Sequence, residues 1–170
     1  MKRIIMLVTL ALMLASAVAI SGVAQAKPIT NTKADTKCLA EAVKTVQQPG
    51  FNPSDYTFHG GTAGEDFFTG QATEGPDVFC GFGGSDQYSP DAGDIFLGGA
   101  GSDQVVVNEG TFYGGEGDDV VFKENWGTFY GGEGNDRVVN NLGTFDGGEG
   151  TDTVATNFPS GTLISVEVDL

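Results

Sequence analysis

Apolar residues recur along this chain at intervals too long for a helix and too regular for a loop. One set of phenylalanines, spaced 17, 16, 17 and 16 residues apart, comprises Phe79, Phe96, Phe112, Phe129 and Phe145. A second set keeps the same spacing and comprises Tyr88, Val105, Val121, Val138 and Val154. Because the two sets are in phase, each interval is one structural repeat, as is typical of a solenoid.

Within a repeat, the residues on either side of these positions alternate in a way that predicts short strands. Thr-Phe-Tyr surrounds both Phe112 and Phe129, and Val121 lies between Val120 and Phe122. Alternation with a period of two places the central residue on one face and its neighbours on the other. We therefore expect an all-β fold, a parallel β-roll or β-solenoid, in which a ladder of Phe faces a ladder of Val.

The pattern changes before the repeats begin. Between residues 35 and 48 one helical face carries Leu39, Ala42, Val43 and Val46, with Cys38 at its edge, and a Pro-Gly pair ends the run. Because a solenoid exposes unpaired backbone at its first coil, we expect this short helix to be an N-terminal cap.

Both ends of the repeat region are irregular. The phrase GGTAGED resembles the later repeats with one extra residue, and we expect Phe58 and Phe68 to occupy the two apolar columns. At the other end, apolar and polar residues alternate from Thr162 to Leu170 and predict a closing strand. The expected division is a signal peptide (1–26), an arm with the capping helix (27–57) and a β-roll with a closing strand (58–170).

The first 26 residues have the three parts of a secretory signal peptide. Two basic residues precede an apolar run from Ile4 to about Ile20, and residues 24–26 read Ala-Gln-Ala, a cleavage site of small residues. A membrane-spanning helix is the less favoured alternative because the run is short and its end is small and polar. We expect a secreted, extracellular product with no membrane span after signal removal.

The chain is strongly acidic, with 23 Asp and Glu residues against 8 Lys and Arg and a formal net charge of −15. Nucleic acid and anionic membranes would repel such a chain, so we exclude both as partners and favour cations. High acidity is also typical of disordered chains. The regular apolar columns instead indicate a chain that folds once its charge is neutralised.

A glycine-rich phrase ends at an aspartate in every regular repeat. The phrases GFGGSD, GGAGSD, GGEGDD, GGEGND and GGEGTD close with Asp86, Asp103, Asp119, Asp136 and Asp152. Glycine adopts the positive φ angles that let successive carbonyl oxygens point to one place. The carboxylate adds an anionic oxygen, and the next coil supplies a second set about 4.8 Å away. Oxygen ligands of these two kinds suit Ca²⁺, which takes about six to eight.

The alternatives to calcium explain less of the pattern. Zinc is disfavoured because the chain has one histidine, His59, which has no acid-base partner apparent in the sequence, and two cysteines. Aspartates that only cap turns would not need three glycines in fixed positions in four of the five phrases. Without a cation, adjacent carboxylates repel by roughly 1 kcal/mol in water and more when shielded. We therefore predict that calcium binding and folding are coupled.

The phrases resemble the calcium-binding nonapeptide G-G-x-G-x-D-x-U-x of RTX, or hemolysin-type, repeat proteins. GGAGSDQVV, GGEGDDVVF, GGEGNDRVV and GGEGTDTVA match every fixed position, whereas GFGGSDQYS lacks the second glycine. The resemblance implies a parallel β-roll with calcium between successive turns on one side. It implies about four sites, between the turns of Asp86 and Asp103, Asp103 and Asp119, Asp119 and Asp136, and Asp136 and Asp152.

The expected metal residues are the glycines and aspartates of these phrases. They are Gly81, Gly84, Asp86, Gly98, Gly99, Gly101, Asp103, Gly114, Gly115, Gly117, Asp119, Gly131, Gly132, Gly134, Asp136, Gly147, Gly148, Gly150 and Asp152. Weaker metal candidates are Asp66, Asp77 and Asp94. The second side of each coil carries NEGT, NWGT or NLGT in place of the motif, and we expect a hydrogen-bonded Asn ladder there.

Two functional classes remain after the sequence is read in full. A secreted calcium-binding protein is favoured. The alternative is an adhesin or surface-binding module, stiffened by calcium, in which the exposed Thr and Tyr ladders bind polysaccharide or ice. No catalytic motif appears, so we expect no enzyme activity. Cys38 and Cys80 are expected to form a disulfide in an oxidising compartment, with two separate buried thiols as the alternative.

Overall fold

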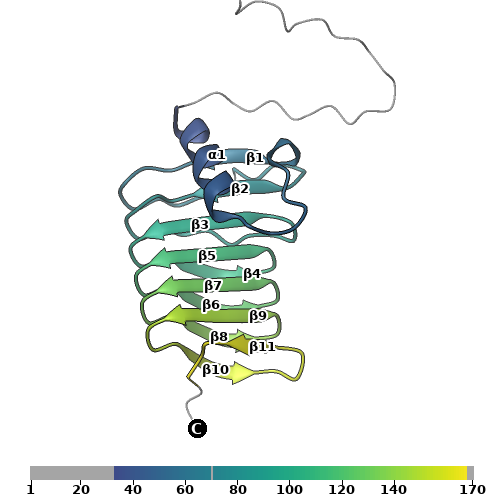
Figure 1. Ribbon diagram of the computed structural model, residues 1–170, viewed down its shortest axis with the longest axis vertical. Coiled ribbons are helices and arrows are strands. Elements are labelled where there is room, and N and C mark those ends of the chain that lie inside the picture. Colours follow the sequence, from purple (N-terminus) through teal and green to yellow (C-terminus); the bar gives the residue numbers. More distant parts are fainter. Residues whose placement is uncertain (1–32, 70, 168–170) are drawn as a thin grey trace, which may run out of the picture.

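The computed structural model describes residues 33–69 and 71–167, so the predicted signal peptide lies outside the described residues. The chain forms a β-solenoid of about 6 turns. Its strands all pair in parallel, and a helix lies across the N-terminal end (Figure 1). The predicted all-β solenoid with an N-terminal capping helix is therefore confirmed.

Two sheets make up the walls of the solenoid. The seven-stranded sheet runs in the order β1 (Thr57–Gly60), β2 (Asp77–Cys80), β3 (Ile95–Ala100), β5 (Thr111–Glu116), β7 (Thr128–Glu133), β9 (Thr144–Glu149) and β11 (Thr162–Ile164). The four-stranded sheet runs in the order β10 (Thr153–Asn157), β8 (Arg137–Asn141), β6 (Val120–Asn125) and β4 (Gln104–Asn108). Before them come helix α1 (Lys33–Thr45) and the short 3₁₀ helix η1 (Pro53–Asp55).

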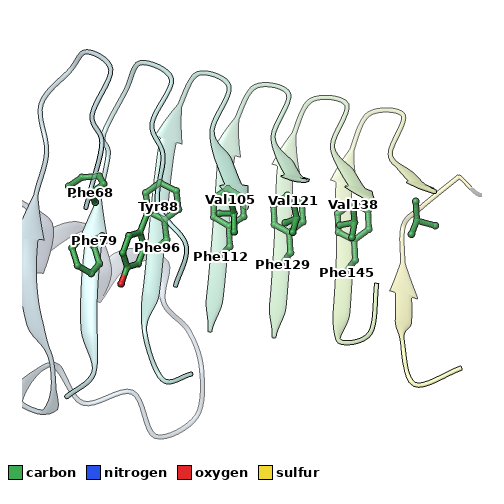
Figure 2. Close-up of a cluster of buried hydrophobic side chains, with 11 residues drawn as sticks. Phe68, Phe79, Tyr88, Phe96, Val105, Phe112, Val121, Phe129, Val138 and Phe145 are labelled. Atoms are coloured by element: carbon green, nitrogen blue, oxygen red, sulfur yellow. The ribbon is translucent and has the colours of Figure 1, made fainter. Parts of the chain in front are cut away.

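The interior of the solenoid is built from the two predicted ladders. Figure 2 shows Phe side chains of the seven-stranded sheet facing Val side chains of the four-stranded sheet, with Tyr88 continuing the Val ladder into the preceding coil. The rings of Phe96, Phe112, Phe129 and Phe145 stack with centroid distances of 5.1, 4.6 and 5.0 Å. Val121 is fully buried whereas Phe122 is 46 % exposed, as the strand alternation predicts.

A further ladder, made of asparagine side chains, lies at the turns on the side that lacks the GGxGxD phrase. The Asn108 amide donates to Asn125 at 2.6 Å, Asn125 to Asn141 at 2.8 Å, and Asn141 to Asn157 at 2.9 Å. The predicted Asn ladder is therefore confirmed, and Asn157 extends it by one coil. The hydrogen bonds between these largely buried amides hold successive coils in register.

The first coil departs from the expected column assignment. Phe68 lies in the core next to Phe79 and Tyr88, as predicted. Phe58 does not occupy the Phe column, because β1 pairs Phe58 with Val78 and His59 with Phe79. The imidazole of His59 stacks on Phe79 with ring centroids 4.4 Å apart. Phe58 instead faces outward and is buried against α1.

Helix α1 packs on the outer face of the first strands, as a cap should. It begins two residues and ends three residues before the predicted limits. Its Cys38 and Ala42, with Val46 directly after the helix, are buried against Phe58. Val43 was expected on this face, but it is 57 % exposed. A disulfide joins Cys38 to Cys80 and fixes the helix to β2, which confirms the predicted pairing.

The closing strand is shorter than predicted. β11 ends at Ile164 because Ser165 adopts φ 49 and the chain turns there. Leu163, paired with Phe145, packs against the core, whereas Ile164 is 46 % exposed. The last part of the predicted strand, residues 168–170, lies outside the described residues. Within the described ranges no helix is long and apolar enough to cross a membrane.

Candidate metal centre

The GGxGxD phrases form the turns that connect the seven-stranded sheet to the four-stranded sheet, at the heads of the β3, β5, β7 and β9 arrows (Figure 1). Gly115 and Gly117 have φ angles of 118° and 119°, which side chains rarely adopt. A Cβ on either would also overlap the backbone of the neighbouring coil, at Gly99 and Gly101 respectively. Glycine is therefore required both for the turn and for the close stacking of coils.

The phrase GFGGSD, which lacks the second glycine, keeps the same conformation under strain. Phe82 holds φ at 73°, an uncommon value for a bulky residue. The ammonium of Lys37 in α1 lies 3.7 Å from the centroid of the Phe82 ring. This contact with the capping helix compensates in part for the strain.

The aspartates that end the phrases form one buried column inside the turns. Asp86, Asp103, Asp119, Asp136 and Asp152 are each at most 2 % exposed. One oxygen of each, Oδ1, accepts a hydrogen bond from the backbone N–H of the aspartate in the preceding coil. The N···O distances from Asp66, Asp86, Asp103, Asp119 and Asp136 to the next aspartate are 2.8, 2.7, 2.7, 2.8 and 2.7 Å.

The second oxygen of the same five carboxylates has no donor. Within residues 33–69 and 71–167, Oδ2 is buried and without a hydrogen-bond partner in Asp86, Asp103, Asp119, Asp136 and Asp152. It lies beside the first glycine of its own phrase, next to a carbonyl oxygen of the following coil, which belongs to the equivalent glycine for the first four aspartates and to Ser165 for Asp152. For Asp119 these neighbours are Gly114 and the Gly131 carbonyl oxygen. In the space between two successive coils, which we call a gap, a carboxylate oxygen therefore lies next to a carbonyl oxygen, and neither atom can donate a hydrogen bond.

Burial makes these carboxylates hard to ionise in the protein alone. Desolvation raises the pKa of Asp86 to about 6, of Asp103 and Asp136 to about 7, and of Asp119 to about 8. Neighbouring carboxylates raise the pKa further, while the backbone hydrogen bond to Oδ1 lowers it. The pKa of Asp152 is raised in the same way. A buried carboxylate normally neutralises or pairs with a cation.

The donor set fits calcium and excludes softer metals. Each gap contains an anionic carboxylate oxygen and a backbone carbonyl oxygen, the hard donors that Ca²⁺ prefers. Among the described residues, no group of three or more His, Cys, Asp or Glu side chains is arranged so that it could hold a metal ion by itself. A metal here would therefore depend on backbone carbonyls and waters as well as on the carboxylates. The predicted glycines and aspartates are brought together, coil by coil.

The gap at the first phrase differs from the others. Asp66 belongs to the column, because its N–H donates to Asp86. Its Oδ2, however, accepts hydrogen bonds from the backbone N–H of Thr62 at 2.7 Å and from the Thr62 hydroxyl at 3.0 Å. This carboxylate is already satisfied by its own turn.

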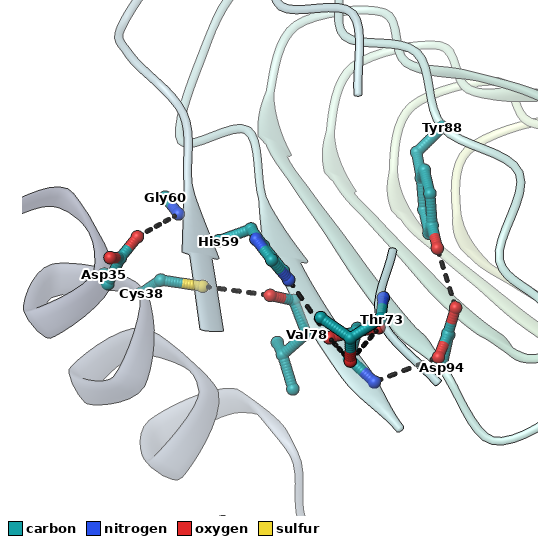
Figure 3. Close-up of polar contacts among 9 residues, drawn as sticks. Asp35, Cys38, His59, Gly60, Thr73, Val78, Tyr88 and Asp94 are labelled. Carbon is teal, nitrogen blue, oxygen red and sulfur yellow. Dashed lines mark hydrogen bonds and ion pairs between the residues drawn. The ribbon is translucent and has the colours of Figure 1, made fainter. Parts of the chain in front are cut away.

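Asp77 and Asp94, the weaker candidates on the opposite side, lie in a network of protein donors (Figure 3). Asp77 accepts from Thr73 and lies 3.0 Å from His59 Nε2. Asp94 accepts from the Asp77 N–H at 2.9 Å and from the Tyr88 hydroxyl at 2.7 Å. Every oxygen of both carboxylates has a protein partner, in contrast to Oδ2 of the five column aspartates, and metal binding by Asp77 and Asp94 stays a prediction. His59 therefore has the acidic partner that the sequence did not reveal.

One member of the column escaped sequence reasoning. The N–H of Asp152 donates to Glu167 Oε2 at 2.7 Å, the same bond that each aspartate makes with its successor. Glu167 lies 15 residues after Asp152, close to the repeat length, and this spacing was the signal that could have found it.

Comparison of the chain with protein-family models, with curated proteins and with solved structures finds no match.

Proposed function

We propose that this protein is a secreted calcium-binding solenoid that holds Ca²⁺ between successive GGxGxD turns. The observation that carries the proposal is the column of five buried carboxylate oxygens without donors, each beside a backbone carbonyl. A cation in each gap would satisfy both acceptors at once. The likeness of the phrases to the RTX nonapeptide supports calcium as the ion.

Calcium binding is coupled to folding in this proposal. The carboxylates are fully buried only when the coils stack, so an unfolded chain lacks the sites. Their raised pKa values mean that stacking without a cation either costs free energy or requires protons. Millimolar calcium, as found outside cells, supplies the missing charge. The disulfide and the predicted signal peptide support an extracellular location.

The test is a calcium titration of the processed protein followed by circular dichroism. We expect β-sheet signal to appear with millimolar CaCl₂ and to disappear with chelator. Magnesium serves as the control ion, because it demands a smaller octahedral site and retains its waters. A β-sheet signal that ignores both calcium and chelator would refute the proposal.

A second function is favoured by the outer face of the seven-stranded sheet. Register pairing aligns Thr111, Thr128, Thr144 and Thr162 on adjacent strands, and the rings of Tyr113 and Tyr130 stack at 4.8 Å. Such a regular array fits a repeating surface such as polysaccharide. The Gln48 amide covers one end by donating to the Thr111 hydroxyl and to Tyr113, so the free ladder begins at Thr128. Binding to a glycan array that Thr128→Ala abolishes, with calcium affinity unchanged, would support this role.

A further inference from the structure

In the last gap of the column, which follows Asp152, a carboxylate oxygen lacks a donor just as in the gaps between two GGxGxD phrases. No sixth GGxGxD phrase follows it. Asp152 is fully buried, and no donor from residues 33–69 or 71–167 reaches its Oδ2. The oxygen lies beside Gly147, and the neighbouring carbonyl oxygen belongs to Ser165. Ser165 thus occupies the place that a motif glycine takes in every earlier gap.

The backbone at this point brings a carbonyl oxygen into the gap by a turn that differs from the motif turn. Ser165 has φ 49, one of two positive φ angles at non-glycine residues in the described part of the chain. The other is Phe82, which replaces a glycine of the first regular phrase. The glycines whose carbonyls line the earlier gaps, Gly98, Gly114, Gly131 and Gly147, have no positive φ, so at Ser165 a different bend of the chain brings a carbonyl oxygen to the same place.

Glu167 supplies the carboxylate of this gap from one register position further along, because it pairs with Thr153, the residue after Asp152. Its Oε2 accepts the Asp152 N–H at 2.7 Å, and its own N–H donates to the Asp152 carbonyl at 2.9 Å. The final coil is one residue shorter than the shortest regular one, and the extra methylene of glutamate restores the reach of the carboxylate.

We infer that Glu167 and the Ser165 carbonyl close a fifth calcium site, with Asp152, at the C-terminal end of the solenoid. This inference rests on the proposed function, and it adds a site that the repeat motif does not contain. Because Glu167 is exposed, water can complete the coordination shell. Calcium then ties the closing strand β11 to the last regular coil.

The Asp66 gap provides the internal contrast. It has an aspartate in the column and a glycine-rich phrase, but Asp66 Oδ2, the oxygen that lacks a donor in the other aspartates, accepts two hydrogen bonds from Thr62. The same criterion that adds a site at Glu167 therefore leaves none at Asp66. Five ions are expected per chain, and all of them lie from Asp86 onward.

The test is native mass spectrometry of the processed full chain at graded calcium concentrations. We expect five bound ions in the wild type, four in Glu167→Gln and five in Glu149→Gln. Glutamine keeps an acceptor for the Asp152 N–H but removes the charge. Glu149 is an exposed acid in the same last regular coil, so its variant is matched in charge. Asp66→Asn is a second control and should retain five.

Each outcome has a definite meaning. A wild type with four ions, or a Glu167→Gln variant with as many ions as the wild type, would overturn the fifth site while leaving the proposed function intact. A wild type with no bound calcium would overturn both. If Glu167→Gln fails to fold, hydrogen exchange of residues 162–167 in the wild type decides: calcium must slow exchange there as it does at β9.

Discussion

Replacing Asp119 with asparagine separates the cost of the buried charge from the benefit of the metal. Asparagine keeps an oxygen that accepts the Asp103 N–H. Its amide nitrogen takes the place of Oδ2, beside the carbonyl oxygen of Gly131, and donates to it. The variant therefore converts an acceptor that faces an acceptor into a hydrogen-bonded pair.

The size of the effect follows from the pKa. Burial raises the pKa of Asp119 from 3.8 to about 8. One pKa unit corresponds to about 1.4 kcal/mol, so at pH 7 this carboxyl destabilises the metal-free fold by on the order of 4 kcal/mol. Total stability of a domain is about 5–15 kcal/mol. In chelator, Asp119→Asn should therefore be several kcal/mol more stable than the wild type.

With saturating calcium the sign reverses. The variant lacks one anionic ligand, and calcium affinity depends on the number of charged ligands. We expect it to be less stable than the wild type and to bind fewer ions. Chemical denaturation followed by circular dichroism measures both states, with trimethylamine N-oxide added in chelator to bring the transition into range. Glu116→Gln, an exposed substitution three residues earlier, is the control.

The reasoning would be refuted by an Asp119→Asn variant that is destabilised equally in calcium and in chelator. That result would mean that the carboxylate stabilises the fold without a metal. Equal calcium stabilisation of variant and wild type would refute the assignment of Asp119 as a ligand.

Three further predictions follow from the same structure. The metal-free protein should gain stability as the pH falls from 8 to 5, because the folded pKa values of about 6 to 8 exceed the unfolded value of 3.8 and each proton bound relieves a buried charge. Thermal unfolding in chelator, with trimethylamine N-oxide added to keep the metal-free chain folded, measures this. Greater stability at pH 8 would contradict it. Gly115→Ala should lose calcium-induced folding, because φ is 118° and the new Cβ would overlap the Gly99 carbonyl. The control Gly64→Ala meets no close atom and should change stability by less than about 0.5 kcal/mol. Calcium titrations compare the folding midpoints of the two variants, and similar midpoints would contradict the strain argument. The double variant Cys38→Ser, Cys80→Ser should lower the free energy of unfolding by about 4 kcal/mol, since the disulfide spans 42 residues and restricts the unfolded chain. Chemical denaturation measures the difference. An unchanged denaturation midpoint would show that the capping helix needs no crosslink.

Much of the site was accessible from sequence because its determinants are local. The repeat length and the alternation around Phe112 and Val121 fix which side chains point inward, and the structure confirms both ladders. The glycines of each phrase encode a turn that only glycine adopts without strain. The disulfide also followed from the placement of one cysteine in the cap and one in the first coil.

The failures occur where a residue's role depends on a partner in another coil. Phe58 was assigned to the core because its type fits the column, but pairing with β2 moves it one position and puts His59 inside. Thr73 and His59, the partners of Asp77, were not apparent from the sequence, because His59 lies on the neighbouring strand. Val43 matched a helical face that the helix does not bury.

The sequence alone determined the coil, its length, its inward-facing columns and the position of the glycine turns, because periodicity and φ preferences are properties of short stretches of chain. Only the tertiary structure decided which oxygen of each aspartate accepts a hydrogen bond and which has no donor. The N–H that donates to Oδ1 belongs to the preceding coil, and the carbonyl oxygen beside Oδ2 belongs to the following coil. It also decided that Glu167 continues the column, since that role requires the chain to turn at Ser165 and stack on Asp152.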